Sequence, residues 1–217
     1  MNKIFIDLEM NKIAREHKEA RKRTIFEIIQ IGAVKINDEN EEVDSFNEYV
    51  RPELSSEMDR KIEKLTGIHF EQIAEADILE NVFRRFIDWC GHDCEIYSWS
   101  ITDKCQIIAE YEIKGLQLPA STESLFEHWH DYQEEFGTLF PHQRPMKLST
   151  AVFLAGLDFS GREHDGLNDA RSTAQLYILM QDDKSYMNFR KKVLANFEPA
   201  AKTTLGDLFD FSSIQIA

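Results

Sequence analysis

The sequence predicts an α/β fold in which helices pack on a mixed β-sheet. Three apolar, β-branched segments follow one another near the N-terminus, and segments with helical periodicity come later, around a further short strand. A chain of 217 residues, 42% hydrophobic and 29% charged, is long enough for one substantial core. We therefore expect one main domain over residues 1–183, followed by an appendage of unknown role at 184–217.

The first three strands are expected at residues 3–9, 25–36 and 43–50, where β-branched and aromatic residues are concentrated. The connections between them are short. Strands joined in this way favour an antiparallel meander, because a parallel pair needs a long crossover.

The later segments predict helices on a second part of the sheet. A helix is expected at 78–89, where apolar residues recur at three-and-four spacing. A strand at 95–99 follows, and then a helix that opens near Thr102 as its N-cap. Further helices are expected at 148–157 and 167–180. Periodicity alone does not separate helix from strand between residues 121 and 140, and past about Asp183 it weakens into the basic patch Arg190-Lys191-Lys192.

Composition limits the classes of function. No apolar run reaches the length of a membrane span, and the N-terminus reads directly into a strand, so we expect neither a signal peptide nor a membrane partner. Three unevenly spaced cysteines give no disulfide framework and favour a cytoplasmic protein. Cys90, His92 and Cys94 lie close together, but their spacing supplies no fourth zinc ligand, so packing or loop positions are favoured.

The net charge of −14 argues against binding of polyphosphate through bulk electrostatics. Any contact with nucleic acid must then be local. The basic cluster Lys18, Arg21, Lys22 and Arg23 is the one notable candidate, and on charge alone a solvated face is the better interpretation.

Two carboxylates end the first strand. Asp7 and Glu9 are two residues apart, so both side chains project to one face of the sheet. Taken alone, such a pair is more often simply solvated. Asp103 follows the strand at 95–99, and Asp169 follows His164 at the start of a helix. In open α/β sheets, groups at strand ends and helix starts converge on one crevice, so we expect these residues to lie near Asp7 and Glu9.

Four acids in one cleft would repel one another strongly. Two unit charges at ~5 Å repel by about 3 kcal/mol at an effective dielectric of 20. Divalent cations would neutralise them, and ligands that are all oxygen suit Mg²⁺ or Mn²⁺. Two such ions ~3.5–4 Å apart are a standard device for in-line attack on a phosphodiester.

The order of these motifs resembles a known family. IDLEMN at the start, LTGI at residues 65–68, YSWSITDKCQI and GLDFSGREHDGLNDA are similar to the DEDDh exonucleases of the DnaQ-like superfamily. The resemblance runs over about residues 3–180. It points to the subgroup that includes the histone-mRNA 3′-end exonuclease and the sporulation inhibitor KapD. It implies a ribonuclease H-like, five-stranded sheet, with residues 125–131 as the last strand.

The resemblance also implies residue roles. Asp7, Glu9, Asp103 and Asp169 would bind two Mg²⁺ or Mn²⁺ ions, and His164 would take a proton from the attacking water, which suits a side chain that titrates near neutral pH. The implied activity is 3′-to-5′ removal of nucleoside 5′-monophosphates from single-stranded nucleic acid, with RNA favoured over DNA.

Some interpretations stay open. Met10, with Asn11 beside it, is a candidate contact for the terminal base, and a core position for Met10 is an equal alternative. Arg171 is expected either to meet a phosphate or to balance the acids. Two other functions are kept as alternatives: a catalytically weak nucleic-acid-binding regulatory module, and a proofreading subunit that docks a polymerase.

Overall fold

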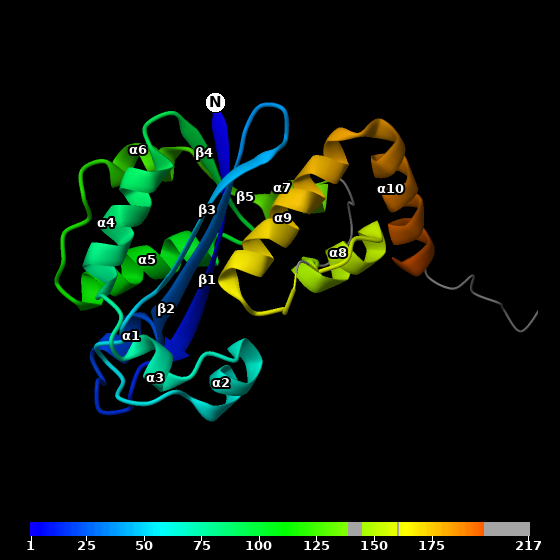
Figure 1. Cartoon of the computed structure of the whole chain (residues 1–217). Helices are drawn as coiled ribbons and strands as arrows, with labels where there is room; N and C mark the ends of the chain where they lie inside the picture. Colours follow the sequence, from blue (N-terminus) through cyan, green and yellow to red (C-terminus); the bar gives the residue numbers. More distant parts are fainter. Residues whose placement is uncertain (139–144, 160, 198–217) are drawn as a thin grey trace, which may run out of the picture.

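A five-stranded sheet with helices on both faces organises the chain (Figure 1). The structure is a computed structural model that describes residues 1–138, 145–159 and 161–197. Within these residues the strand order is β3-β2-β1-β4-β5. The α/β fold predicted from the sequence is confirmed.

The first three strands form the predicted antiparallel meander. They are β1 (Asn2–Lys12), β2 (Phe26–Ile36) and β3 (Glu42–Tyr49), and β2 pairs antiparallel with both of its neighbours. The central strand β1 runs three residues past the predicted end at Glu9, and its register against β2 shifts between Glu9 and Met10.

Parallel pairing builds the other half of the sheet. β4 (Cys94–Ser98) pairs parallel with β1, and β5 (Trp129–Asp131) pairs parallel with β4. The prediction of a last strand at 125–131 is therefore wrong over its first half, because residues 125–127 belong to α6 (Thr122–Glu127). A helix there lets Leu125 pack into the core.

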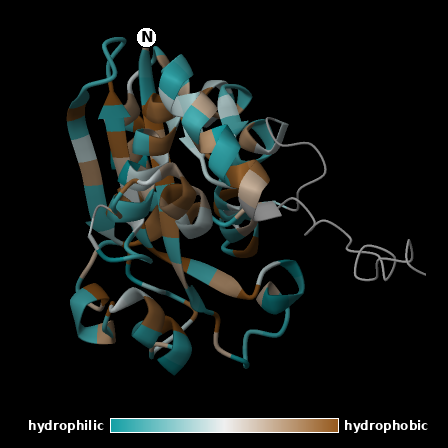
Figure 2. Cartoon of the chain, turned by 90° about the vertical axis from the view of Figure 1, so that its right-hand side faces the viewer, coloured by the Kyte–Doolittle hydropathy of each residue, from teal (hydrophilic) through white to brown (hydrophobic). Residues whose placement is uncertain are grey.

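Helices of the two faces bury separate hydrophobic clusters, and Figure 2 shows brown, apolar residues concentrated along the strands between them. Alternation along β1 sends Ile4, Ile6 and Leu8 into one cluster and Phe5 into the other. The first cluster lies under α4 (Leu79–Cys90), α5 (Thr102–Ile113) and α6, and the second lies under α7 (Tyr132–Thr138), α8 (Leu148–Ala155), α9 (Gly166–Gln181) and α10 (Asp183–Phe197).

Three short helices lie beyond the end of the sheet. They are α1 (Ala20–Arg23), α2 (Arg60–Thr66) and α3 (Phe70–Ile73), and the sequence analysis predicted none of them. A small third cluster of Ile29, Met58, Ile68 and Ile73 packs this region against β2. Each helix is too short for its periodicity to stand out in the sequence.

Helix starts and the end of the chain differ in detail from expectation. Thr102 is the first residue of α5 rather than its N-cap, and the capping position is Ile101. Past Asp183 the chain continues as α10, whose Phe189 and Val193 are buried in the second cluster. The basic patch 190–192 lies on the exposed side of α10. Residues 198–217 of the predicted appendage, and 139–140 of the ambiguous segment, lie outside the described residues, and no described helix is long and apolar enough to cross a membrane.

Candidate active site

The paired acids of β1 lie on the face of the sheet that α9 covers. Leu8 packs into the opposite cluster, so Asp7 and Glu9 on either side of it project toward α9. Glu9 is 7% exposed, and Asp7 is partly buried. The charge of Glu9 raises the pKa of Asp7, as expected for two carboxylates on the same face of the strand.

Asp103 comes to the same place because β4 is shorter than β1. The parallel ladder ends where Ile6 pairs with Ser98, which leaves the next amide of β1 without a strand partner. The Asp103 carboxylate takes that position, and Leu8 N donates to its Oδ1 at 3.1 Å. Because Asp103 lies in the first turn of α5, the helix start fixes this side chain beside Asp7.

Asp169 is brought in by a close crossing of two backbones. The start of α9 passes so near β2 that a Cβ on Gly32 would lie 2.1 Å from Gly166 C, and one on Gly166 would lie 2.9 Å from Asp7 O. Glycine at both positions permits this approach. Buried Gln30 accepts a hydrogen bond from Gly166 N at 3.2 Å, which fixes the first turn that carries Asp169.

His164 lies on the loop directly before α9. Its backbone is in the left-handed region at φ 61°, and His164 N donates to Asp169 Oδ2 at 3.1 Å. Asp165 caps the helix by accepting from Asn168 N. A ring nitrogen of His164 and a carboxylate oxygen from each of Glu9 and Asp169 lie within 4.8 Å of one another. The His164 side chain therefore lies beside these two acids, and it is partly exposed.

The four carboxyl groups all hold their protons more tightly than ordinary acids do. Burial raises the pKa of Glu9 to about 8, with Asp169 and Asp165 adding to the effect. Burial also raises the pKa of Asp103 and of Asp169 to about 7, although amide donors at Leu8 and His164 oppose the shift. The pKa of Asp7 is raised by burial and then by the charges of Asp103, Glu9 and Asp169.

This donor set fits divalent cations. The buried Asp169 Oδ1 has no hydrogen-bond partner among the described residues, although a buried carboxylate oxygen is normally satisfied. The carboxyl groups lie close together, and their pKa values are raised. A bound cation would stabilise their charged forms. Asp7, Glu9, Asp103 and Asp169 offer oxygen alone, which suits Mg²⁺ or Mn²⁺, and His164 is the one nitrogen donor in the group.

The raised pKa values predict that the metal-free protein loses stability as pH rises. A carboxyl whose pKa is higher in the folded state stabilises that state while it is protonated, and the stabilisation is lost as pH rises through the folded pKa. With Glu9 near 8 and Asp103 and Asp169 near 7, the loss should extend from about pH 4 to about pH 8. We expect the melting temperature in EDTA to fall by roughly 5 °C or more between pH 5.5 and 8.5.

Excess Mg²⁺ should remove most of this fall, since a cation bound by the charged carboxylates stabilises the folded state. The Asp7→Asn variant is the matched control, because it removes one acid of the cluster and should show a shallower fall in EDTA. If the melting temperature fell equally with pH in Mg²⁺ and in EDTA, for both the wild type and the variant, the ionisation of these acids would not be coupled to folding.

The two predicted substrate contacts, Met10 and Asn11, lie at different depths. Met10 is partly buried and packs against the first core cluster. The Asn11 side chain is fully buried, donates to Glu57 O at 3.0 Å and accepts from Asp59 N at 2.9 Å. It therefore tethers the segment before α2 to β1. Contact of either residue with a substrate stays a prediction.

Other residues singled out from the sequence have structural partners. Arg171 pairs with Glu42 at 2.7 Å, which neither of the two expected roles anticipated. In the basic cluster, Lys22 pairs with Glu19 and Arg23 with Glu112, as on a solvated face.

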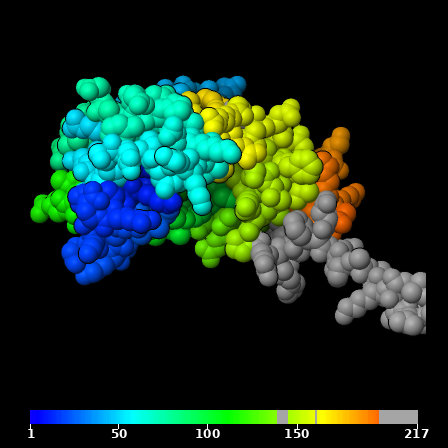
Figure 3. Space-filling model, turned by 90° about the horizontal axis from the view of Figure 1, so that it is seen from below, coloured from blue at the N-terminus to red at the C-terminus, as the bar shows by residue number. Residues whose placement is uncertain are grey.

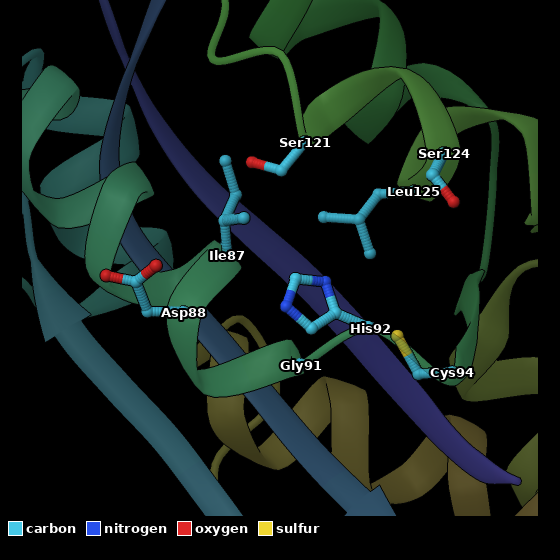
Figure 4. A pocket seen from close by; sticks show the side chains of 8 residues that line it. All are labelled: Ile87, Asp88, Gly91, His92, Cys94, Ser121, Ser124 and Leu125. Carbon is cyan, nitrogen blue, oxygen red and sulfur yellow. The ribbon is translucent and has the colours of Figure 1, made fainter.

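The Cys90 and Cys94 thiols lie away from the acids, because Cys94 pairs with Asn2 at the start of β1. A cavity of about 220 Å³ lies at the opposite end of β4, lined by His92, Cys94 and residues of α4 and α6 (Figure 4). Cys90 and Cys94 are buried in the first core cluster, as expected for packing positions. Among the described residues, no metal-ligand group includes them.

Arg162 is a residue near the site that the sequence analysis missed. Its guanidinium donates to the carbonyls of Lys64 and Leu65 at the end of α2, and its charge lowers the pKa of Glu9. It packs over Gly67, the left-handed C-cap of α2 with φ 72°, where a Cβ would collide with the guanidinium. The partner lies about 100 residues away in sequence, so no local pattern marks the contact.

The sequence matches the RNase_T family, described as exonuclease, over residues 4–177. The chain belongs to this family. It is an exonuclease-family domain, and the five-stranded sheet that the sequence motifs implied is confirmed.

Named relatives and solved structures agree with this assignment. The chain is 26% identical over 181 residues to 3′-5′ exoribonuclease 1 of Rattus norvegicus, covering 78% of this chain and 51% of the relative. It is 30% identical over 190 residues to human ERI1 exoribonuclease 2, covering 77% and 27%. The chain thus spans about half, or less, of the length of these relatives. The nuclease domain of 3′hExo, a DEDDh family member solved bound to rAMP, has a similar fold with a TM-score of 0.71 at 24% identity, covering 84% of this chain and 92% of that one.

Proposed function

We propose that this protein is a 3′-to-5′ exonuclease that hydrolyses the last phosphodiester bond of single-stranded nucleic acid and releases nucleoside 5′-monophosphates. The observation that carries the proposal is the convergence of Asp7, Glu9, Asp103 and Asp169 from three elements around one buried, unpartnered carboxylate oxygen. Family membership supports the reaction class.

Each element has a task in the reaction. β1 presents Asp7 and Glu9, and the helix starts of α5 and α9 present Asp103 and Asp169. These carboxylates would bind two Mg²⁺ or Mn²⁺ ions, which supply an activated water and stabilise the leaving oxygen. His164 accepts the proton of the attacking water, and its hydrogen-bonded loop keeps the imidazole beside Glu9 and Asp169.

RNA is the favoured substrate. Relatives of similar sequence are named exoribonucleases, and one structural neighbour recognises the 3′ end of a histone mRNA stem-loop. A more distant neighbour, exonuclease I of E. coli, has been solved with a dT13 oligonucleotide, so DNA belongs in the test as a second arm.

The test uses single-stranded RNA and DNA of equal sequence, labelled at the 5′ end and incubated with Mg²⁺. We expect a ladder that shortens one nucleotide at a time from the 3′ end, nucleoside 5′-monophosphates as products, and no reaction in EDTA. A 3′-phosphate should slow the reaction if the site reads a free terminal hydroxyl.

Circular RNA is the control for direction. It has no 3′ end and should stay intact. Internal fragments from the circle would indicate an endonuclease and contradict the proposal. Binding of the strands without any cleavage would favour the alternative of a regulatory module.

A further inference from the structure

Two cysteines lie together at the junction of α4 and β4. Cys90 is the last residue of α4, and Cys94 is the first residue of β4. Gly91 turns the chain between them with a φ of 79°, a backbone conformation that glycine adopts readily. A side-chain hydrogen bond joins the two thiols, and both cysteines are free. The turn therefore holds two reduced thiols in direct contact, and we call them the thiol pair.

The two members of the thiol pair differ in access. Cys94 lines the cavity of about 220 Å³ between α4 and α6, and Figure 4 shows its sulfur directed toward the cavity, beside His92. Cys90 is 3% exposed, packs in the first core cluster and does not line this cavity. A small molecule that enters the cavity therefore meets the Cys94 sulfur first.

The two thiols also differ in how easily they lose a proton. The hydrogen bond from Cys90 lowers the pKa of Cys94, burial opposes this shift, and the charge of Lys35 adds to it. Burial, and then the same hydrogen bond, raises the pKa of Cys90. Lys35 is fixed beside the pair because its Nζ donates to Trp89 O at the end of α4. Since the thiolate is the nucleophilic form, Cys94 is the more reactive of the two.

The thiol pair is separate from the acidic site. Cys94 pairs with Asn2 at the start of β1, whereas Asp7 is five residues further along, about 17 Å at the rise of a β-strand. The short helices α1, α2 and α3 lie beyond the other end of the sheet and form the blue and cyan part of the face in Figure 3. Chemistry at the thiol pair is therefore independent of the proposed exonuclease reaction.

We infer that the thiol pair is a site of reversible oxidation by peroxide, in which Cys94 reacts first and Cys90 then closes a disulfide. The contact between the thiols and the cavity that reaches only one of them carry the inference. Hydrogen-bonded thiols already lie near the separation of a disulfide, so closure needs only a small movement of the side chains.

The reaction has two steps. The Cys94 thiolate attacks one oxygen of hydrogen peroxide, an S–O bond forms, the O–O bond breaks, and the departing hydroxide takes up the proton that the thiol lost. The Cys90 sulfur then attacks the Cys94 sulfur, an S–S bond forms, the S–O bond breaks, and the hydroxyl leaves as water with the Cys90 proton. Two thiols and one peroxide thus give one disulfide and two waters, and a thiol reductant reverses the change.

The test uses the full chain carrying Cys105→Ser, which removes the exposed cysteine and leaves the thiol pair as the only thiols. The folded protein is treated with hydrogen peroxide, then unfolded and labelled with N-ethylmaleimide. We expect the untreated protein to take up two maleimide groups and the oxidised protein to take up none. The tryptic peptide 86–104, which contains both cysteines, should lose the mass of two hydrogen atoms, and reduction should restore both labels.

Cys90→Ala and Cys94→Ala, each in the Cys105→Ser chain, form a matched pair that assigns the order of the steps. Without Cys90, the sulfenic acid on Cys94 should persist and react with dimedone. Without Cys94, the remaining thiol is buried and protonated, so we expect at least about tenfold less dimedone adduct.

Several results would overturn the inference. They are uptake of two maleimide groups after peroxide treatment, a disulfide that joins two chains or forms only after unfolding, a sulfinic acid on Cys94 in place of the disulfide, and equal adduct yields in the two alanine variants. The maleimide measurement does not depend on either alanine variant folding, because it leaves the thiol pair intact.

Discussion

Asp7→Asn should reduce exonuclease activity by more than about 10³-fold, beyond the 10²–10³-fold that loss of one transition-state donor costs elsewhere. The charges of Asp103, Glu9 and Asp169 all raise the pKa of Asp7, so its carboxylate interacts with each of the other three acids. Asparagine keeps the shape of the side chain and removes the negative charge that a cation requires. The measurement is the initial rate on labelled RNA in saturating Mg²⁺.

Stability separates this loss of activity from misfolding. Because Asp7 is crowded by like charges, its replacement should leave the melting temperature in EDTA unchanged or raise it. The gain in melting temperature on adding Mg²⁺ should shrink in the variant. Asp88→Asn, which changes an exposed acid of α4, is the control and should behave as the wild type in both assays.

Wild-type activity in the folded Asp7→Asn protein would contradict the assignment of the acidic site. It would mean that the cleft acids do not hold the reacting phosphate, whatever the family of the chain. A variant that is inactive and also melts earlier in EDTA would point to a structural role for Asp7 and would leave its catalytic role unsupported.

The parts of the fold that could be predicted are those set by local pattern. Alternation along β1 placed Asp7 and Glu9 on one face, and the periodicity of residues 78–89 predicted α4. The spacing of His164 and Asp169 likewise matched a loop followed by a helix start. In each case the deciding contacts lie within one element.

Long-range packing accounts for what the sequence did not reveal. The Gly32–Gly166 crossing joins positions more than 130 residues apart. The Leu8–Asp103 hydrogen bond forms because the parallel pairing of β1 with β4 ends at Ile6, before it reaches Leu8. The helix α10 was missed because its apolar residues do not form one stripe: Phe189 and Val193 are buried, whereas Met187 and Leu194 are exposed. A local sequence pattern does not show where the pairing of two strands ends or which backbone segment packs beside a residue.

His164→Ala should lower the rate by roughly 10²–10⁴-fold, the usual size of a general-base contribution. Alanine also has to adopt the left-handed backbone at φ 61°, which costs about 1–2 kcal/mol and could displace the loop. His164→Asn is therefore the companion variant, because asparagine tolerates this conformation. Equal losses in the two variants would assign the effect to the imidazole rather than to the backbone.

A rival role for His164 is that of a metal ligand, since its ring nitrogen lies within 4.8 Å of carboxylate oxygens of Glu9 and Asp169. The two roles differ in their response to metal concentration. If His164 is the base, the concentration of Mn²⁺ giving half-maximal rate should stay near the wild-type value, and excess Mn²⁺ should not restore activity. Rescue by Mn²⁺ would make the histidine a ligand, and an undiminished rate in both variants would move the base to another group.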